Sequence, residues 1–174
     1  FKMRLIELRA NKKSFHTVTF NPNGITVIAA IKETEDQKKT YNSVGKSLTI
    51  ALIHFCLGSN SNKEFETKLN DWIFYLDFQI GAENYTVKRS INNQKEIELN
   101  GQVYSLKEFN KLLESKLFRI KENTKYVTFR SLLPRFIRYG EDGYISNDRY
   151  IKKEAPIATL LNNAFLLGLD TDLI

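Results

Sequence analysis

The segment from Leu48 to Leu57 constrains the fold more than any other part of the sequence. Its residues, LTIALIHFCL, are apolar on almost every side of a helix, and Gly58 follows at a position typical of a helix C-terminal cap. A helix without a polar face must be surrounded by other elements, so we expect it inside a domain. With 42% hydrophobic and 12% aromatic residues, a chain of 174 residues can build the core that this helix requires.

Short stretches of alternating polarity predict a β-rich region around this helix. The dipeptide Asn100-Gly101 separates two of them and is the strongest short signal for a hairpin turn. A β-branched run over residues 25–30 predicts a further strand, buried on both faces. The alternating stretches are Met3–Leu8, Thr17–Phe20, Asp71–Ile80, Asn84–Ile91, Glu96–Leu99 and Gln102–Tyr104.

The C-terminal third of the chain has helical periodicity. Ser105 and Glu108 form a capping-box pattern ahead of apolar residues spaced along one helix face, up to Leu117. A second helical pattern covers residues 129–137, where Pro134 predicts a kink or a restart. A third begins at Pro156 and ends before Gly168. No repeat, low-complexity tract or linker divides the sequence.

Gly45-Lys46-Ser47 stands directly before the buried helix and matches the end of a phosphate-binding loop. In such a loop, backbone N–H groups face the phosphates, the lysine contacts the β and γ oxygens, and the hydroxyl ligates Mg²⁺. The expected strand at 25–30 and the helix after Ser47 supply the required strand–loop–helix context. Thr40 occupies the position of the first glycine in the full pattern. We therefore expect a nucleotide site in residues 40–48.

The sequence around this loop resembles the N-terminal segment of the ATPase head of SMC-like and RecN-like ABC ATPases. The resemblance is carried by FNPNGITVIAA and YNSVGKSLTIALIHFCLG, and extends to EFNKLLESKLF, TFRSLLPRFIR and LLNNAFLLGLD. More narrowly, the chain is similar to an uncharacterised bacterial coiled-coil group that includes ATPases of three-component ABC systems associated with phage defence. Thr40 and Ser43 depart from the pattern, since related ATPases usually have glycine at both positions.

The resemblance implies an α/β fold, namely the N-terminal lobe of a P-loop NTPase head with an antiparallel β subdomain and C-terminal helices, as one domain over residues 1–174. It implies binding of ATP and Mg²⁺, with Lys46 acting in catalysis and Ser47 ligating the metal. A C-terminal lobe, joined through a coiled coil, would supply the Walker B acid, so the isolated chain is expected to be inactive as an ATPase. A second head, DNA, and components of a defence or repair system are the other implied partners. The implied nucleotide ligands are Asn42, Ser43, Val44, Gly45, Lys46, Ser47 and Leu48.

The charge balance favours anionic partners. Twenty-six Lys and Arg against 20 Asp and Glu give a formal net charge of +6. Arg130, Arg135 and Arg138 oppose the apolar positions of the helix expected over 129–137, so we expect them on a solvent-exposed face. They are candidates for contact with DNA phosphates. A solvated arginine face without a ligand is the alternative interpretation.

The few cysteine and histidine residues exclude several classes of site. A single cysteine, Cys56, rules out an intramolecular disulfide, and only two histidines, His16 and His54, argue against a multi-histidine metal centre. No apolar run approaches the roughly 18 residues that span a membrane. We therefore expect no membrane partner and a reducing, cytoplasmic location.

Two other functions stay open. A stand-alone P-loop kinase or GTPase would need its own Walker B aspartate, for which Asp77 in FYLDF is the candidate. A non-catalytic interaction module would use residues 40–48 as a degenerate loop, as the departures at Thr40 and Ser43 suggest. ATP turnover by the chain alone would favour the first alternative, and failure to bind nucleotide would favour the second.

Overall fold

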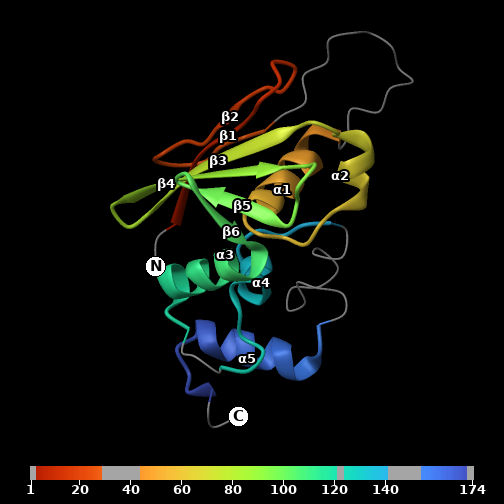
Figure 1. Cartoon of the computed structure of the whole chain (residues 1–174). Coiled ribbons are helices and arrows are strands. Elements are labelled where there is room, and N and C mark those ends of the chain that lie inside the picture. The colour runs from red at the N-terminus through yellow and green to blue at the C-terminus, as the bar shows by residue number, and fades with distance from the viewer. Residues whose placement is uncertain (1–2, 29–43, 121–123, 141–153, 172–174) are drawn as a thin grey trace, which may run out of the picture. The chain divides into compact units, whose positions relative to one another are not determined.

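The structure is a computed structural model, which describes residues 3–28, 44–120, 124–140 and 154–171. The chain divides into two compact units, Phe1–Leu106 and Lys107–Ile174, which are described in turn. Helices and strands both contribute (Figure 1), so the mixed α/β class expected from the sequence is confirmed.

The first unit is built on a six-stranded antiparallel sheet with the strand order β2-β1-β3-β4-β5-β6. All six alternating stretches of the sequence form strands, as predicted. Asn100 (φ 49°) and Gly101 (φ 86°) form the turn between the last two strands, which is the left-handed backbone that a tight hairpin requires. The strands are β1 (Met3–Ala10), β2 (Val18–Thr19), β3 (Ile73–Ile80), β4 (Glu83–Ser90), β5 (Glu96–Leu99) and β6 (Gln102–Ser105).

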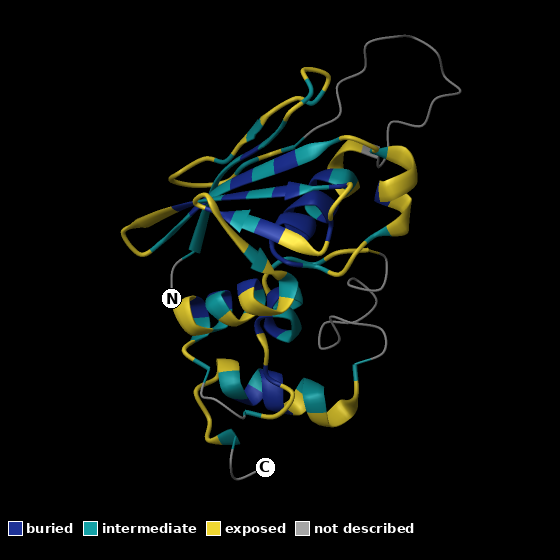
Figure 2. Ribbon diagram, viewed as in Figure 1, coloured by how far each residue is buried: buried dark blue, intermediate teal, exposed yellow. Residues whose placement is uncertain are grey.

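Helices α1 (Val44–Cys56) and α2 (Lys63–Lys68) complete this unit, and α1 lies against one face of the sheet (Figure 1). Residues 51–57 are each at most 8% exposed, so the buried helix predicted from the apolar run is confirmed (Figure 2). Its end also agrees with the prediction, because Gly58 has a φ of 79°. The inward side chains of β3, Phe74, Leu76 and Phe78, are buried on the α1 face.

The stretch Ile25–Ile28 corrects the prediction of a buried strand at 25–30. These four residues belong to no strand, and the side chains of Ile25 and Val27 are 85% and 81% exposed. A β-branched run predicts a strand only where another strand supplies hydrogen-bond partners, and no described strand pairs with Ile25–Ile28. Residues 29 and 30 lie outside the described part of the chain.

The second unit contains short helical segments around a small apolar core of Val127, Leu132 and Leu161. Pro134 has the predicted effect, because α4 stops at Leu132 and a 3₁₀ turn follows it. The last helix ends as expected before Gly168 (φ 73°). The segments are α3 (Leu106–Leu113) with a π-helical turn (Glu114–Phe118), α4 (Phe129–Leu132), the 3₁₀ turn (Leu133–Arg135) and α5 (Pro156–Leu166).

Candidate functional site

The predicted phosphate-binding residues Gly45, Lys46 and Ser47 lie in the first turn of α1. All three are exposed, whereas Leu48 is half-buried and Thr49 is buried. The N–H groups of a first helical turn have no carbonyl partner inside the helix, and the helix dipole places a positive potential there. No acidic residue in the first turn of α1 offsets this potential. An anion is therefore electrostatically favoured at this end of α1.

The side chains of Lys46 and Ser47 are available to a ligand. Across the residues that the structure describes, neither side chain makes a hydrogen bond or an ion pair. Thr49, by contrast, donates its hydroxyl to the Gly45 carbonyl oxygen at 2.8 Å. A lysine in the first turn is disfavoured by the helix dipole, and a bound anion would offset this repulsion.

The structure tests only part of the predicted nucleotide site. Asn42 and Ser43 lie outside the described residues, as does Thr40 at the position of the first glycine. The rest of the predicted ligands, from Val44 to Leu48, begin α1. The sequence predicted Gly45, Lys46 and Ser47 directly before the helix, whereas the structure includes them in its first turn. Their binding of nucleotide stays a prediction.

Asp77, the candidate acid of a stand-alone enzyme, lies on the face of the sheet opposite to α1. Side chains alternate along β3, and Phe74, three residues before Asp77, packs against Phe55 of α1 with ring centroids 6.4 Å apart, so Asp77 is on the other face. The Asp77 carboxylate instead accepts hydrogen bonds from Thr86 Oγ1 at 2.6 Å and Arg9 Nε at 3.3 Å. It is therefore held in cross-strand pairs, on the wrong side of the sheet to act beside Ser47.

Arg135 corrects the prediction of an exposed arginine face. Its side chain is only 3% exposed and that of Glu154 is 7% exposed, and the guanidinium binds both carboxylate oxygens at 3.1 and 3.0 Å. The physical reason is the 3₁₀ turn at Pro134, which has about 3.0 residues per turn instead of about 3.6. The change in period rotates the residues that follow away from the face predicted for a continuous α-helix, and Phe136 is accordingly 62% exposed.

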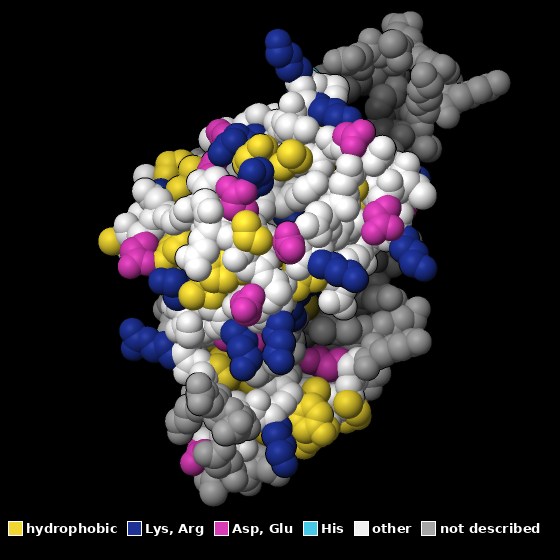
Figure 3. Space-filling model, in the orientation of Figure 1, with side chains coloured by type: hydrophobic (Ala, Val, Ile, Leu, Met, Phe, Trp, Pro, Cys, Tyr) yellow, Lys and Arg dark blue, Asp and Glu magenta, His cyan; other side chains and the backbone are white. Residues whose placement is uncertain are grey.

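The other two arginines of the predicted DNA contact are half-buried. Burial lowers the pKa of Arg130 to about 10, because the charged guanidinium loses hydration. Lys and Arg side chains on the face seen in Figure 3 are interspersed with Asp and Glu. Contact of Arg130 and Arg138 with DNA stays a prediction.

The buried cysteine and histidine of α1 are core residues. Cys56 is fully buried, and this burial raises the pKa of its thiol to about 12. The thiol therefore stays protonated at neutral pH and serves poorly as a metal ligand or nucleophile. His54 is 5% exposed. Within the described ranges, no group of three or more His, Cys, Asp and Glu side chains is placed to hold a metal ion.

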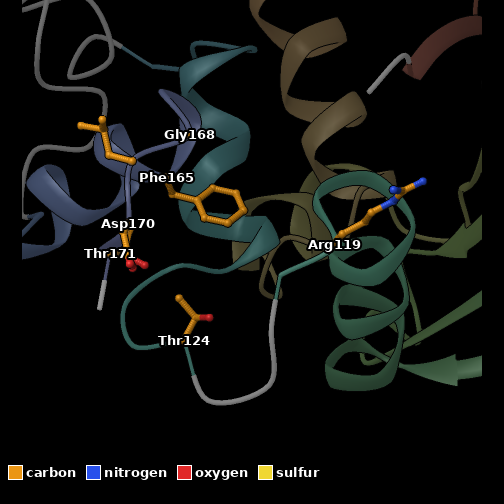
Figure 4. Close-up of a pocket in the computed structure, with 7 residues that line it drawn as sticks. Arg119, Thr124, Phe165, Gly168, Asp170 and Thr171 are labelled. Atoms are coloured by element: carbon orange, nitrogen blue, oxygen red, sulfur yellow. The ribbon is translucent and has the colours of Figure 1, made fainter. Parts of the chain in front are cut away.

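The second unit has a cavity of about 290 Å³ at the end of α5. Figure 4 shows the Phe165 ring between Arg119 on one side and Asp170 and Thr171 on the other, with the Arg119 guanidinium directed away from them. None of the predicted nucleotide, metal or DNA ligands lines this cavity. The lining residues are Arg119, Thr124, Phe165, Gly168, Leu169, Asp170 and Thr171.

One buried residue was missed by the sequence reasoning. Arg89 is 1% exposed and lies beneath the C-terminal end of α1. The alternation along the strand could have predicted this burial. Tyr85, Val87 and Ile91 are the inward residues of the strand, and Arg89 occupies the inward position between Val87 and Ile91.

Comparisons with protein-family models, with curated proteins and with solved structures find no match for this chain. None of the described helices combines the length and the apolar character needed to cross a bilayer. The functional argument therefore depends on the geometry at the N-terminus of α1.

Proposed function

We propose that residues 40–48, including the N-terminus of α1, bind ATP with Mg²⁺, and that the chain is the N-terminal part of a composite, SMC-like ATPase that acts on DNA. One observation carries the proposal. Lys46 and Ser47 are exposed, and their side chains make no hydrogen bond or ion pair with another described residue, although they stand in the first turn of a helix that is otherwise largely buried. Binding of phosphate and of Mg²⁺ would give both polar side chains a role at this helix end.

The donor groups at this helix end suit a nucleotide. First-turn N–H groups and the Lys46 ammonium would bind phosphate oxygens and neutralise their charge. The Ser47 hydroxyl would ligate Mg²⁺, which prefers oxygen ligands and takes most of them from phosphates and water. A single protein hydroxyl is therefore a sufficient anchor for the metal.

The exposed residues Ile25 and Val27 support the composite part of the proposal. Both are apolar and β-branched, and they stand in the stretch that precedes the loop. Burying one such side chain contributes about 1.5–3 kcal/mol. We expect a strand of a C-terminal lobe to pair with this stretch and cover both side chains.

ATP hydrolysis by this chain alone is expected to stay at background. Asp77 is turned away from α1, and we expect the acid that orients the attacking water to come from the other lobe. Steady-state hydrolysis by residues 1–174 that Lys46→Ala abolishes would favour the stand-alone kinase or GTPase instead.

Isothermal titration calorimetry with Mg·ATP tests the proposal. Lys46→Ala should weaken binding by at least about tenfold, because a charge-assisted hydrogen bond contributes about 1.5–3 kcal/mol. Lys63→Ala is the matched control, since Lys63 is an exposed first-turn lysine of α2, whose N-terminus is already capped by Asn62. Equal ATP affinity in wild type and Lys46→Ala would show that the loop is not the site. No binding by wild type would favour the interaction module.

A further inference from the structure

Arg89 is a large, charged side chain in the core of the first unit. It lies on β4 and is 1% exposed. Burying a guanidinium is costly unless hydrogen bonds replace its hydration. The groups that provide those bonds therefore show what the residue holds together.

The Arg89 guanidinium connects the end of α1 to the segment between β4 and β5. Nη1 donates to the carbonyl oxygen of Phe55, the penultimate residue of α1. Nε and Nη2 both donate to the carbonyl oxygen of Gln94, Nε at 3.1 Å. The guanidinium carbon also lies 4.1 Å from the centroid of the Phe55 ring. A cation at this position also complements the negative end of the helix dipole.

The network continues from Gln94 to the start of α2. The Gln94 side chain accepts a hydrogen bond from Asn62 N at 2.7 Å and donates one to Asn62 O at 3.1 Å. The Asn62 side chain in turn caps α2, and the rings of Phe55 and Phe65 pack with centroids 5.6 Å apart. Arg89 thus holds the C-terminal end of α1 against two other elements.

We infer that Arg89 is a positioning residue for the nucleotide site at the opposite end of α1, an inference that rests on the proposed function. Because α1 is one continuous helix from Val44 to Cys56, a shift at Phe55 would also displace Lys46 and Ser47 relative to the sheet. Phosphate contacts tolerate displacements of only about 0.5 Å. Lysine in place of Arg89 keeps the charge but lacks the fork that binds two carbonyl oxygens at once.

The test compares three variants of the chain. Each is assayed under conditions in which the buried thiol of Cys56 stays protected from labelling, because this protection shows that the first unit is folded. Arg89→Lys should weaken Mg·ATP binding about three- to tenfold. Gly101→Ala is the control: its φ of 86° strains an added side chain and lowers the melting temperature, without contact to α1. It should leave ATP affinity unchanged. Gln94→Ala, a milder change that keeps both Arg89 acceptors, should weaken binding about twofold in the same direction.

Hydrogen exchange of α1 amides gives a readout that needs no nucleotide. Arg89→Lys should raise exchange along α1 more than in β3, whereas Gly101→Ala should raise both equally. If wild type binds ATP and neither Arg89→Lys nor Gln94→Ala weakens binding, or if Gly101→Ala weakens it as much, the positioning role is wrong. If wild type fails to bind ATP, the proposed function and the positioning role fail together. Faster hydrogen exchange along α1 in Arg89→Lys would then show only that Arg89 stabilises this helix.

Discussion

The buried ion pair between Arg135 and Glu154 makes the second unit sensitive to single substitutions. Arg135→Met removes the guanidinium but keeps a side chain of similar length, and leaves Glu154 buried at 7% exposure. The carboxylate retains hydrogen bonds from Thr159 Oγ1 at 3.1 Å and Asn162 Nδ2 at 3.4 Å. These neutral donors replace only part of the lost interaction.

The geometry sets the size of the effect. Arg135→Met removes two charge-assisted hydrogen bonds from the guanidinium to Glu154. It also removes the hydrogen bond from Arg135 Nε to Asn163 Oδ1 at 2.9 Å. Removing one partner of a buried pair costs about 3–5 kcal/mol, because the other charge stays buried. The double change Arg135→Met/Glu154→Leu buries no charge and should cost less than either single change. The two sites should therefore be strongly coupled in a double-mutant cycle.

The chain offers separate probes for its two units. Hydrogen exchange of α5 amides reports the stability of the second unit, and fluorescence of the only tryptophan, Trp72, reports the first. Arg135→Met should lower α5 protection and leave the Trp72 transition in urea unchanged. Two results would refute the buried, coupled pair. One is a loss of less than about 1 kcal/mol in the free energy of unfolding on Arg135→Met, and the other is a loss in the double variant that equals the sum of the two single losses.

Two further predictions concern Cys56 and DNA. The folded pKa of Cys56, about 12, lies above the reference value of 9.0, so the unfolded state loses its proton first and stability falls as pH rises above 9. Denaturant titrations should show that the free energy of unfolding falls between pH 8 and pH 10 by about 1.4 kcal/mol more in wild type than in Cys56→Ala. An equal pH dependence in the two proteins would contradict the buried thiol. Fluorescence anisotropy should show weak, salt-sensitive binding of duplex DNA, reduced more by Arg130→Gln/Arg138→Gln than by the charge-matched control Lys107→Gln/Lys111→Gln. If the two double variants lose the same DNA affinity, net charge alone explains the binding.

The features that could be predicted from the sequence are those fixed by local chemistry. Asn100-Gly101 predicted its hairpin because few other residues adopt a positive φ at two successive positions. The run from Leu48 to Leu57 predicted a buried helix because no face of it suits water. Gly45, Lys46 and Ser47 were expected directly before that helix, whereas the structure includes them in its first turn, because α1 begins at Val44.

The features that could not be predicted depend on partners distant in the sequence. Ile25 and Val27 have strand propensity, but the described residues provide no strand to pair with them. Arg135 was placed on a solvent face because Glu154, its partner, is 19 residues away and no pattern links the two. Helix α2, with Phe65 as its one buried residue, is too short for a periodic signal.

Amide chemical shifts on addition of Mg·ATP test the central claim most directly. In ¹H–¹⁵N spectra of the wild-type chain, the largest changes should fall on Gly45, Lys46, Ser47 and Leu48, because first-turn N–H groups would donate to the phosphates. In the same titration of Lys46→Ala, these amides should reach the same shifts only at ATP concentrations at least about tenfold higher than in wild type. Changes confined to the cavity around Phe165, or no changes anywhere, would contradict a nucleotide site at the start of α1.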